Sequence, residues 1–215
     1  MGGVVEPANR QGRRKARTRA ALVGAARQLL STRHPAEISI QEITDLADVG
    51  FGSLYGHFQS KTELFEVAVA EVLDEHGALL EVALADIEDP AEVFAAGVRL
   101  TGRLPRSYPQ IAEITMRTGL DYLHSPSGIG PRALRDLERA HAAGRLRLED
   151  PELALHCTAG SLIAALHLVS RDPQQADRIA DELAVTMLRM FGMDDGEARE
   201  VVGRPLPTVP QDLPA

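Results

Sequence analysis

A short stretch of the chain, residues 50–61, gathers side chains suited to contacting another molecule. Leu54 and Phe58 lie four residues apart, so on a helix they share one face, while Phe51 and Ser53 lie on other faces. One face can therefore hold the segment against a core. The opposite face is left for a partner.

The stretch follows a second short amphipathic segment, residues 38–49, across the turn Asp48-Val49. Two short helices joined by a tight turn are typical of a helix-turn-helix unit, whose second helix enters the major groove of DNA. None of the groups at the start of that helix is Arg, Asn or Gln, so we expect sparse direct readout. Phe51 is expected to meet thymine methyl groups, Ser53 to make one hydrogen bond, and the glycines to allow close approach of the backbone. The predicted base readers are Gln41, Phe51, Gly52, Ser53 and Gly56.

A longer pattern contains this unit. The run Ala47-x-Val49-x-x-Gly52-Ser53-Leu54-Tyr55-x-His57-Phe58-x-Ser60-Lys61-x-Glu63-Leu64 resembles the DNA-binding signature of the tetracycline-repressor (TetR) family. Arg19 and Ala25-Ala26 fall where that signature begins, and the motif covers about a quarter of the chain. The resemblance implies that Tyr55, His57 and Lys61 contact DNA phosphates. The alternatives are a polar His57 satisfied within the small domain and a core Tyr55 with a wet hydroxyl.

Two positions depart from the family pattern. Asp48 stands where the family usually has Gly, and Gly50 where it usually has Ser or Thr. Asp tolerates the left-handed turn conformation and Gly is an acceptable helix N-cap, so we expect the turn to survive both changes. The Asp48 carboxylate is expected to weaken binding to a phosphate surface.

A basic cluster opens the helix predicted from residue 13 to about residue 32. Cations at a helix N-terminus oppose the helix dipole, which favours a phosphate partner over a merely solvated helix end. The predicted phosphate contacts from this helix are Arg13, Arg14, Lys15, Arg17 and Arg19.

The charge distribution supports a polyanionic partner despite a net charge of -8 over 215 residues. Residues 1–61 hold nine Arg and Lys against five Asp and Glu, a net charge of +4, which leaves -12 for residues 62–215. DNA should therefore be met by the first quarter and repelled by the rest. The single cysteine, Cys157, excludes an internal disulfide framework and fits a reducing cytoplasm. No apolar run reaches the roughly 18 residues of a membrane span, so we expect a cytoplasmic protein with no membrane partner.

Residue patterns for other chemistry are missing. The histidines form no metal-binding spacing, and neither a nucleophile elbow nor a phosphate-binding loop occurs. Cys157 has only His156 as a basic neighbour in sequence, which favours an inert buried thiol over a nucleophile. We therefore expect no enzyme activity, no metal and no cofactor.

Helical spacing runs through every long segment, so the predicted fold is all-α, with about nine helices. An N-terminal three-helix helix-turn-helix domain is expected to precede a C-terminal helical domain for ligand binding and dimerisation. Capping boxes at Ser39-Glu42 and Ser60-Glu63 predict helix starts. The predicted divisions are a flexible arm at 1–12, the DNA-binding domain at 13–60, the effector-binding and dimerisation domain at 61–193, and a disordered Pro-rich tail at 194–215.

Two further sets of residues are assigned roles in the C-terminal domain. Small residues and a stripe on the last two predicted helices suggest a subunit interface, although the stripe could equally be core. By resemblance, the middle helices should enclose an effector cavity, with Arg117 a possible anion partner. The interface set is Gly160, Ala164, Ala165, Leu183, Met187 and Met190, and the cavity set is Phe94, Met116, Arg117, Tyr122 and Leu123.

These observations together predict a homodimeric transcriptional repressor that binds a near-palindromic double-stranded DNA operator and is released by a small-molecule effector. The alternatives are a ligand-independent architectural DNA-binding protein and an enzyme housed in the helical body.

Overall fold

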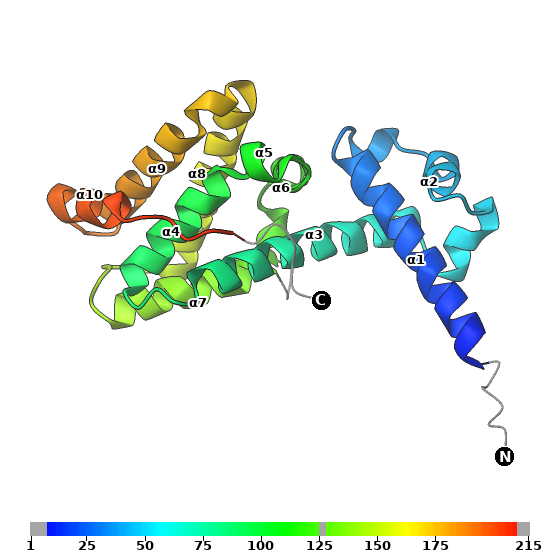
Figure 1. The fold of residues 1–215 in the computed structure, drawn as a ribbon, viewed down its shortest axis with the longest axis horizontal. Helices are drawn as coiled ribbons and strands as arrows, with labels where there is room; N and C mark the ends of the chain where they lie inside the picture. The colour runs from blue at the N-terminus through cyan, green and yellow to red at the C-terminus, as the bar shows by residue number, and fades with distance from the viewer. Residues whose placement is uncertain (1–7, 125–127, 210–215) are drawn as a thin grey trace, which may run out of the picture. The chain divides into compact units, whose positions relative to one another are not determined.

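The computed structural model describes residues 8–124 and 128–209, and this part of the chain holds helices and no strand (Figure 1). The predicted all-α fold is confirmed. Contacts divide the chain into two compact units, Met1–Val69 and Ala70–Ala215, and α3 contributes to both. The elements are α1 Ala8–Leu30, η1 Pro35–Glu37, α2 Ile40–Leu46, η2 Phe51–Gly56, α3 Lys61–Leu84, α4 Pro90–Gly102, α5 Leu104–Ser107, α6 Pro109–Thr118, η3 Gly119–His124, α7 Ile129–Ala142, α8 Pro151–Arg171, η4 Pro173–Gln175, α9 Ala176–Met190 and α10 Asp195–Gly203.

The N-terminal unit is built from α1, α2, η2 and the first turns of α3. Leu22 and Ala26 of α1 are fully buried, as are Ile43 of α2 and Leu54 of η2. These apolar groups recur at helical spacing and so face a common core. Because Leu64 and its neighbours on α3 belong to this unit, the division falls after residue 69, not after residue 60 as the sequence predicted.

Local capping fixes where the short helices begin. Ser39 Oγ accepts a hydrogen bond from the Glu42 backbone N–H at 3.2 Å, and the Glu42 carboxylate accepts from the Ser39 N–H at 2.8 Å. This confirms the predicted capping box. At α3, Ser60 Oγ accepts from the Glu63 N–H at 3.1 Å, whereas the Glu63 carboxylate accepts from the N–H of Gln59, one residue earlier than predicted.

The turn between α2 and η2 contains a left-handed residue. Asp48 has φ of 52°, the conformation that the sequence predicted it to tolerate. Gly50 is extended and precedes η2, which is a 3₁₀ helix of six residues, tighter than the α-helix expected.

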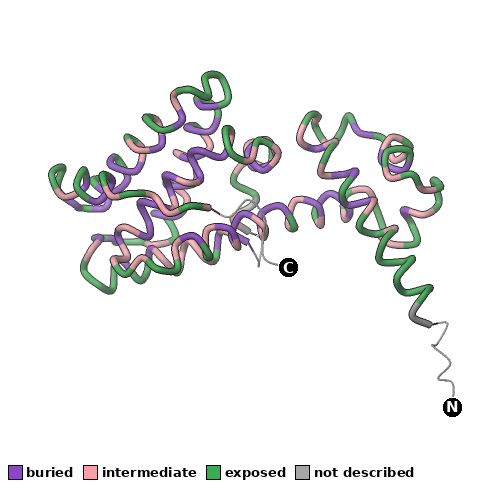
Figure 2. Tube along the Cα trace, viewed as in Figure 1, coloured by how far each residue is buried: buried purple, intermediate pink, exposed green. Residues whose placement is uncertain are grey.

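In the C-terminal unit, α4 contacts α7, α8, α9 and α10 and forms the centre of the core. Its backbone approaches α9 closely at Gly102, where a Cβ would lie 2.8 Å from the Cβ of Ala180. Figure 2 shows that buried residues line the facing sides of these helices. The rings of Phe94 on α4 and Phe191, just after α9, meet edge to face with centroids 5.7 Å apart.

The predicted disordered tail is wrong for residues 194–209. Asp194 caps α10 by accepting from the Glu197 N–H at 2.9 Å, and Ala198 and Val201 are buried against the core. The sequence interpretation gave too much weight to the prolines. A helix of eight to ten residues with three apolar groups is stable only when it packs on other elements, and the sequence does not show that packing. Residues 210–215 lie outside the described part of the chain, as do residues 1–7 of the predicted arm, whose residues 8–12 belong to α1.

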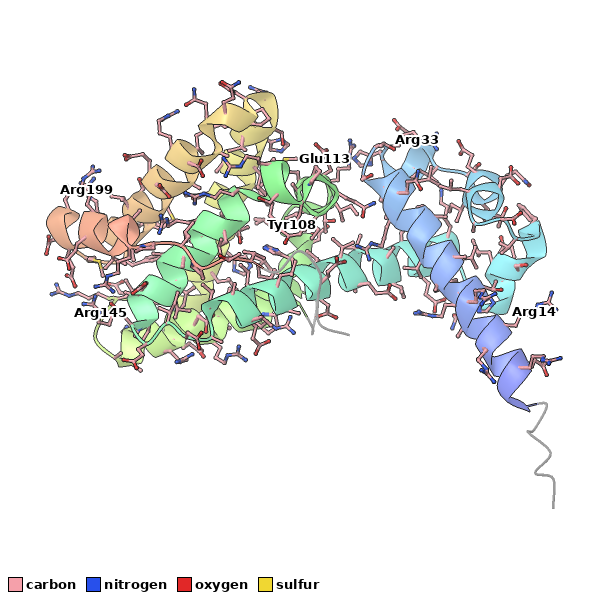
Figure 3. The ribbon with its side chains drawn as sticks, in the orientation of Figure 1. Arg14, Arg33, Tyr108, Glu113, Arg145 and Arg199 are labelled. Atoms are coloured by element: carbon pink, nitrogen blue, oxygen red, sulfur yellow. The ribbon has the colours of Figure 1, made fainter. Side chains whose placement is uncertain are left out.

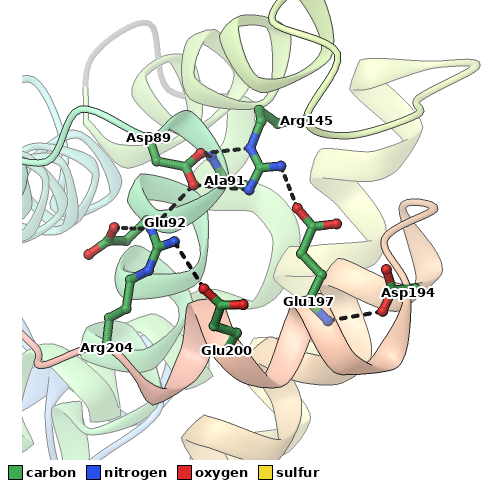
Figure 4. A network of polar contacts seen from close by, with 8 residues as sticks. All are labelled: Asp89, Ala91, Glu92, Arg145, Asp194, Glu197, Glu200 and Arg204. Atoms are coloured by element: carbon green, nitrogen blue, oxygen red, sulfur yellow. Dashed lines mark hydrogen bonds and ion pairs between the residues drawn. The ribbon is translucent and has the colours of Figure 1, made fainter.

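Ion pairs hold α10 to the start of α4 (Figure 4). Arg145 donates two hydrogen bonds of 3.0 Å to Asp89 and also pairs with Glu197, and Arg204 pairs with Glu92 at 2.6 Å. The hydrogen bonds from Arg145 keep the pKa of Asp89 below its usual range, so this carboxylate stays ionised. Asp89 additionally caps α4 by accepting from the Ala91 N–H at 3.0 Å.

Candidate functional site

The outer face of η2 exposes two aromatic side chains. Phe51 is 51% exposed and Tyr55 is 57% exposed, and their rings meet edge to face with centroids 6.5 Å apart. Leu54 and Phe58 are buried, as the helical spacing predicted. The alternative interpretation of Tyr55 as a core aromatic is therefore wrong, and a hydrophobic pair faces outward where water would normally favour polar groups.

A glycine follows each of these aromatic residues, Gly52 after Phe51 and Gly56 after Tyr55. A Cβ placed on Gly52 or on Gly56 would meet no atom within 4 Å, and neither residue has a positive φ. Neither packing nor backbone conformation within the protein demands glycine at these positions. A partner that approaches the backbone closely would demand it. Ser53, between them, is partly exposed and could reach the same partner.

The predicted phosphate-binding residues of α1 are exposed, and Figure 3 shows Arg14 projecting from this helix. Because α1 begins at Ala8, the cluster lies beyond its first turn, so the dipole argument that placed these cations at the helix end does not hold. The guanidinium carbon of Arg19 lies 5.4 Å from the centre of the Phe58 ring, and this cation–π contact joins α1 to the segment between η2 and α3.

The contacts of Lys61 inside the N-terminal unit favour a structural role over the phosphate contact that the resemblance implied. Its ammonium donates to the carbonyl oxygens of Pro35 at 3.1 Å and Ile38 at 2.7 Å, and lies 5.7 Å from the centre of the Phe65 ring. Two of its three N–H donors are thus used inside the unit. The sequence interpretation missed this because the acceptors are backbone carbonyls more than twenty residues away.

The remaining predicted DNA contacts are at the surface or near it. Gln41 is exposed on α2, and its amide donates to Asp45 at 2.6 Å, one helical turn on. His57 is half-buried beside the Phe58 ring, with centroids 6.5 Å apart. Their contacts with DNA stay predictions.

The C-terminal unit has a partly open cavity of about 280 Å³ among α3, α4, α7 and α8. Phe94 and Leu162 form part of its apolar wall, and Glu81, Arg132 and Asp136 form part of its polar wall. Burial raises the pKa of Asp136, against the neighbouring guanidiniums of Arg135 and Arg139.

Arg132 is a polar group of this cavity that its neighbours hold closely. Its Nε lies 3.3 Å from a Glu81 carboxylate oxygen, while its buried Nη1 makes no hydrogen bond among the described residues and lies 3.6 Å from an Asp74 carboxylate oxygen. Gly77 makes room for it, since a Cβ there would lie 2.3 Å from Nη1. The sequence interpretation missed this cluster; the one signal was a glycine inside a helix, which usually has a packing or functional reason.

A second, larger cavity of about 880 Å³ lies beside α3, α4 and α5. Arg103 Nε donates to Asp177 at 2.6 Å, and Arg106 donates to the other oxygen of the same carboxylate at 2.8 Å. These bonds lower the pKa of Asp177, Arg103 contributing first. His76, which also lines the cavity, is 2% exposed, and its Nε2 lies 3.3 Å from Thr101 Oγ1. Burial lowers the pKa of His76 from 6.5 to about 4, so the imidazole is neutral near pH 7.

Of the five predicted cavity residues, Phe94 lines the smaller cavity. Met116, Arg117 and Leu123 line neither of the two cavities described; Met116 contacts Ser170, Arg117 lies 3.7 Å from Glu113, and Leu123 packs against the core. The Tyr122 side chain lies outside the described residues.

The predicted subunit interface is corrected in part. Ala165 and Met187 are only 5% and 4% exposed and face the core of their own subunit, so the structure places them there and not at the surface. Ala164 and Met190 are exposed, and Gly160 and Leu183 are half-buried. Cys157 is exposed, which overturns its interpretation as a buried thiol.

An exposed stripe runs along α8 through Leu153, Cys157, Ala164 and Leu168, all at helical spacing. By length and composition α8 could cross a membrane, but 44% of its most apolar stretch is buried inside the protein. No group of three or more His, Cys, Asp or Glu that could hold a metal ion occurs in residues 8–124 and 128–209.

Comparison with known proteins identifies the two units. Residues 22–68 match the sequence model of bacterial regulatory proteins of the tetR family, and residues 89–204 match that of the tetracyclin repressor-like C-terminal domain. The crystal structure of RolR without ligand is 34% identical, covers 89% of this chain and all of its own, and has a TM-score of 0.72. RolR in complex with resorcinol is 33% identical over 93% of this chain and all of its own, with a TM-score of 0.68.

More distant relatives agree. An HTH-type transcriptional regulator of Mycobacterium tuberculosis, Rv1255c, is 31% identical over 91 residues, which span 42% of this chain and 45% of that protein. The chain thus matches less than half the length of this curated relative. A TetR-family regulator from Shewanella sp. PV-4, 18% identical over 82% of this chain and 99% of its own with a TM-score of 0.66, shows the same fold. With both units matched and RolR covered along its whole length, the chain belongs to the TetR family of bacterial regulatory proteins.

Proposed function

We propose that this chain is a cytoplasmic transcriptional repressor that binds a near-palindromic DNA operator as a homodimer and is released by a small molecule. The observation that carries the proposal is the outer face of η2, where two exposed aromatic residues are each followed by a glycine that nothing in the described structure requires. That face suits close insertion into a groove. The exposed cations of α1, in the same compact unit, supply phosphate contacts that set its orientation.

Specific recognition needs two copies of the N-terminal unit at a fixed separation, because successive major-groove faces recur every ~34 Å. The stripe of Leu153, Ala164 and Leu168 on α8, with Met190 on α9, offers an apolar surface to a second copy. A helix that crosses a membrane is apolar on every side, whereas the opposite face of α8 packs on its own core. The stripe therefore fits a helix of a partner subunit better than lipid.

The effector proposed for the smaller cavity is a small hydroxylated aromatic compound. RolR, 33% identical, has been crystallised with resorcinol. In this chain a volume of about 280 Å³ accommodates one aromatic ring, with Phe94 and Leu162 on its apolar side. Arg132 Nη1, which makes no hydrogen bond among the described residues and lies 3.6 Å from Asp74, can donate to a ligand hydroxyl oxygen, and Glu81 can accept a hydrogen bond from the hydroxyl.

Release from DNA then follows from α3, which is continuous between the two units. Its first turns belong to the N-terminal unit, whereas Gly77 and Glu81, further along, line the smaller cavity. A ligand that binds better to one position of α3 shifts the population toward that conformer. Operator and effector must then weaken each other by the same factor.

The test begins by selecting bound DNA from a random pool with the full-length protein, and continues by titrating resorcinol into the complex with the selected operator. We expect a near-palindromic winner and its displacement by resorcinol. Arg132→Gln should keep operator affinity and lose the resorcinol response. Arg178→Gln, an exposed position on α9 that lines neither described cavity, is the matched control. Equal affinity for selected and random DNA would rule out a sequence-specific repressor, and release unaffected by Arg132→Gln would rule out this effector site.

A further inference from the structure

We propose that the larger cavity, of about 880 Å³, is a second ligand site that takes an amphipathic organic carboxylate. This goes beyond the proposed function, which uses the smaller cavity alone. The larger cavity is lined by α3, α4, α5, the first turn of α9 and the C-terminal segment after α10.

One part of the cavity is apolar. Four leucines line it, Leu79 and Leu80 of α3, Leu100 of α4 and Leu104 of α5. The C-terminal segment adds three further apolar groups, Leu206, Pro207 and Val209. This segment is anchored beside the cavity, since the Arg204 carbonyl accepts from Arg99 Nη1 at 2.9 Å. An alkyl chain placed here would leave water along much of its length.

The other part carries an excess of positive charge. Arg99, Arg103 and Arg106 line the cavity and share two carboxylates, those of Asp177 and Asp181, so one positive charge is left without a counterpart in this cluster. Arg99 and Arg103 are 8% and 9% exposed and are held in place by 2.8 Å bonds to Asp181. Guanidiniums fixed in this way bind a carboxylate without further loss of side-chain entropy.

A buried polar group adds an independent reason for a ligand. His76 lines the cavity, yet its Nδ1 is buried and has no hydrogen-bond partner among the described residues. If Nε2 accepts from the Thr101 hydroxyl, Nδ1 carries the ring proton and can donate to an anion. An unsatisfied buried donor is costly, and a carboxylate would remove that cost.

The two cavities can be separated experimentally, because Leu80 alone among the described residues lines both. Arg106 lines the larger cavity and Arg135 the smaller one, and both side chains are more than half exposed. Replacing either by Gln should leave the fold intact, which a thermal melt checks. The two Gln variants are therefore matched, and the one that weakens binding of a ligand shows which cavity the ligand occupies.

The experiment is calorimetric titration of octanoate into the full-length protein without DNA, with octanol as the uncharged probe of equal chain length. We expect one saturable site for octanoate with Kd on the order of 10⁻⁴ M and about tenfold weaker binding of octanol. Arg106→Gln should weaken octanoate about tenfold, Arg106→Lys should restore part of the loss, and Arg135→Gln should have no effect. Absence of octanoate binding up to about 10 mM, equal affinity for octanol, or an equal loss in the two Gln variants would each overturn the proposal.

Discussion

The Lys61 ammonium lies 2.7 Å from the carbonyl oxygen of Ile38, and it joins the start of α3 to the segment that leads into α2. A second bond, to the Pro35 carbonyl at 3.1 Å, places the same ammonium across the end of η1. A charged donor that satisfies two backbone acceptors holds the first turn of α3 against the segment before α2. Lys61 therefore stabilises the N-terminal unit through contacts inside it.

Lys61→Ala should lower the free energy of unfolding of the N-terminal unit by about 1–3 kcal/mol, because two carbonyl oxygens lose a charged donor. The slope of log affinity for DNA against log salt should stay unchanged. Arg17→Ala, which removes an exposed cation of α1, should instead leave stability unchanged and reduce that slope by about one unit. Urea unfolding and fluorescence anisotropy at several salt concentrations measure the two quantities. A Lys61→Ala protein with normal stability and a reduced slope would return Lys61 to the phosphate contacts.

Asp48 has φ of 52°, a backbone conformation that is less favourable for aspartate than for glycine. Asp48→Gly should raise the free energy of unfolding by about 0.5–1 kcal/mol, whereas Asp48→Asn, which tolerates the same conformation, should leave it near the original value. Both substitutions remove a carboxylate beside the proposed DNA surface and should raise affinity at low salt. Denaturant unfolding and anisotropy separate the effects of strain and charge. Equal stability of the two variants would show that the turn is not strained.

The open space around Gly52 and Gly56 predicts that alanine affects binding and not folding. Gly52→Ala and Gly56→Ala should keep or slightly raise stability, because alanine favours helical backbone. Each should weaken operator binding about tenfold, since a methyl group separates the backbone from DNA. Gly24→Ala on α1, where a Cβ also meets nothing within 4 Å, serves as the control and should bind normally. Unchanged binding by all three variants would place the DNA elsewhere.

The exposed stripe of α8 predicts a dimer that one charge disrupts. Leu168 is 53% exposed, and Leu168→Glu should convert the protein to monomers at about 10 µM, because a carboxylate buried between helices has no partner. Val82→Glu on α3, where the side chain is 48% exposed, should remain dimeric. Light scattering after size-exclusion chromatography gives the masses. Alkylation of Cys157 should also be slower in the dimer than in the Leu168→Glu protein. If the Leu168→Glu protein stayed dimeric and its Cys157 reacted as fast as in the original protein, this stripe would not be the dimer interface.

The buried His76 predicts a specific loss of stability in acid. Its pKa falls from 6.5 to about 4 on folding, so below pH 6.5 the unfolded chain binds a proton that the folded protein does not. The titration of His76 therefore leaves the free energy of unfolding unchanged above pH 6.5 and lowers it by about 3 kcal/mol as the pH falls towards 4. His76→Gln lacks the titrating group and should lose less stability than the original protein over that range. Carboxylates titrate in both proteins, so the difference between their urea-unfolding curves isolates His76. Parallel curves would contradict a neutral, buried imidazole.

Local sequence determined the features whose causes lie within a few residues. The helix at Ile40 begins where Ser39 and Glu42 cap each other, and the left-handed turn falls on Asp48, which tolerates it. Apolar spacing also predicted the buried pair Leu54, on η2, and Phe58, just after it. Capping, turn conformation and helical periodicity act over one or two turns, so residue order alone carries them.

Tertiary structure decided what depends on distant partners. Periodicity shows that a helix has an apolar face but not which neighbour covers it, so Ala165 and Ala164, adjacent in sequence, divide between core and surface. The acceptors of Lys61 and the walls of both cavities come from segments far apart in the chain. The C-terminal helix is likewise held by Asp89, Glu92 and Arg145, more than fifty residues upstream. Such contacts form only when the chain has packed, because the groups that make them are far apart in the sequence and meet only in the folded protein.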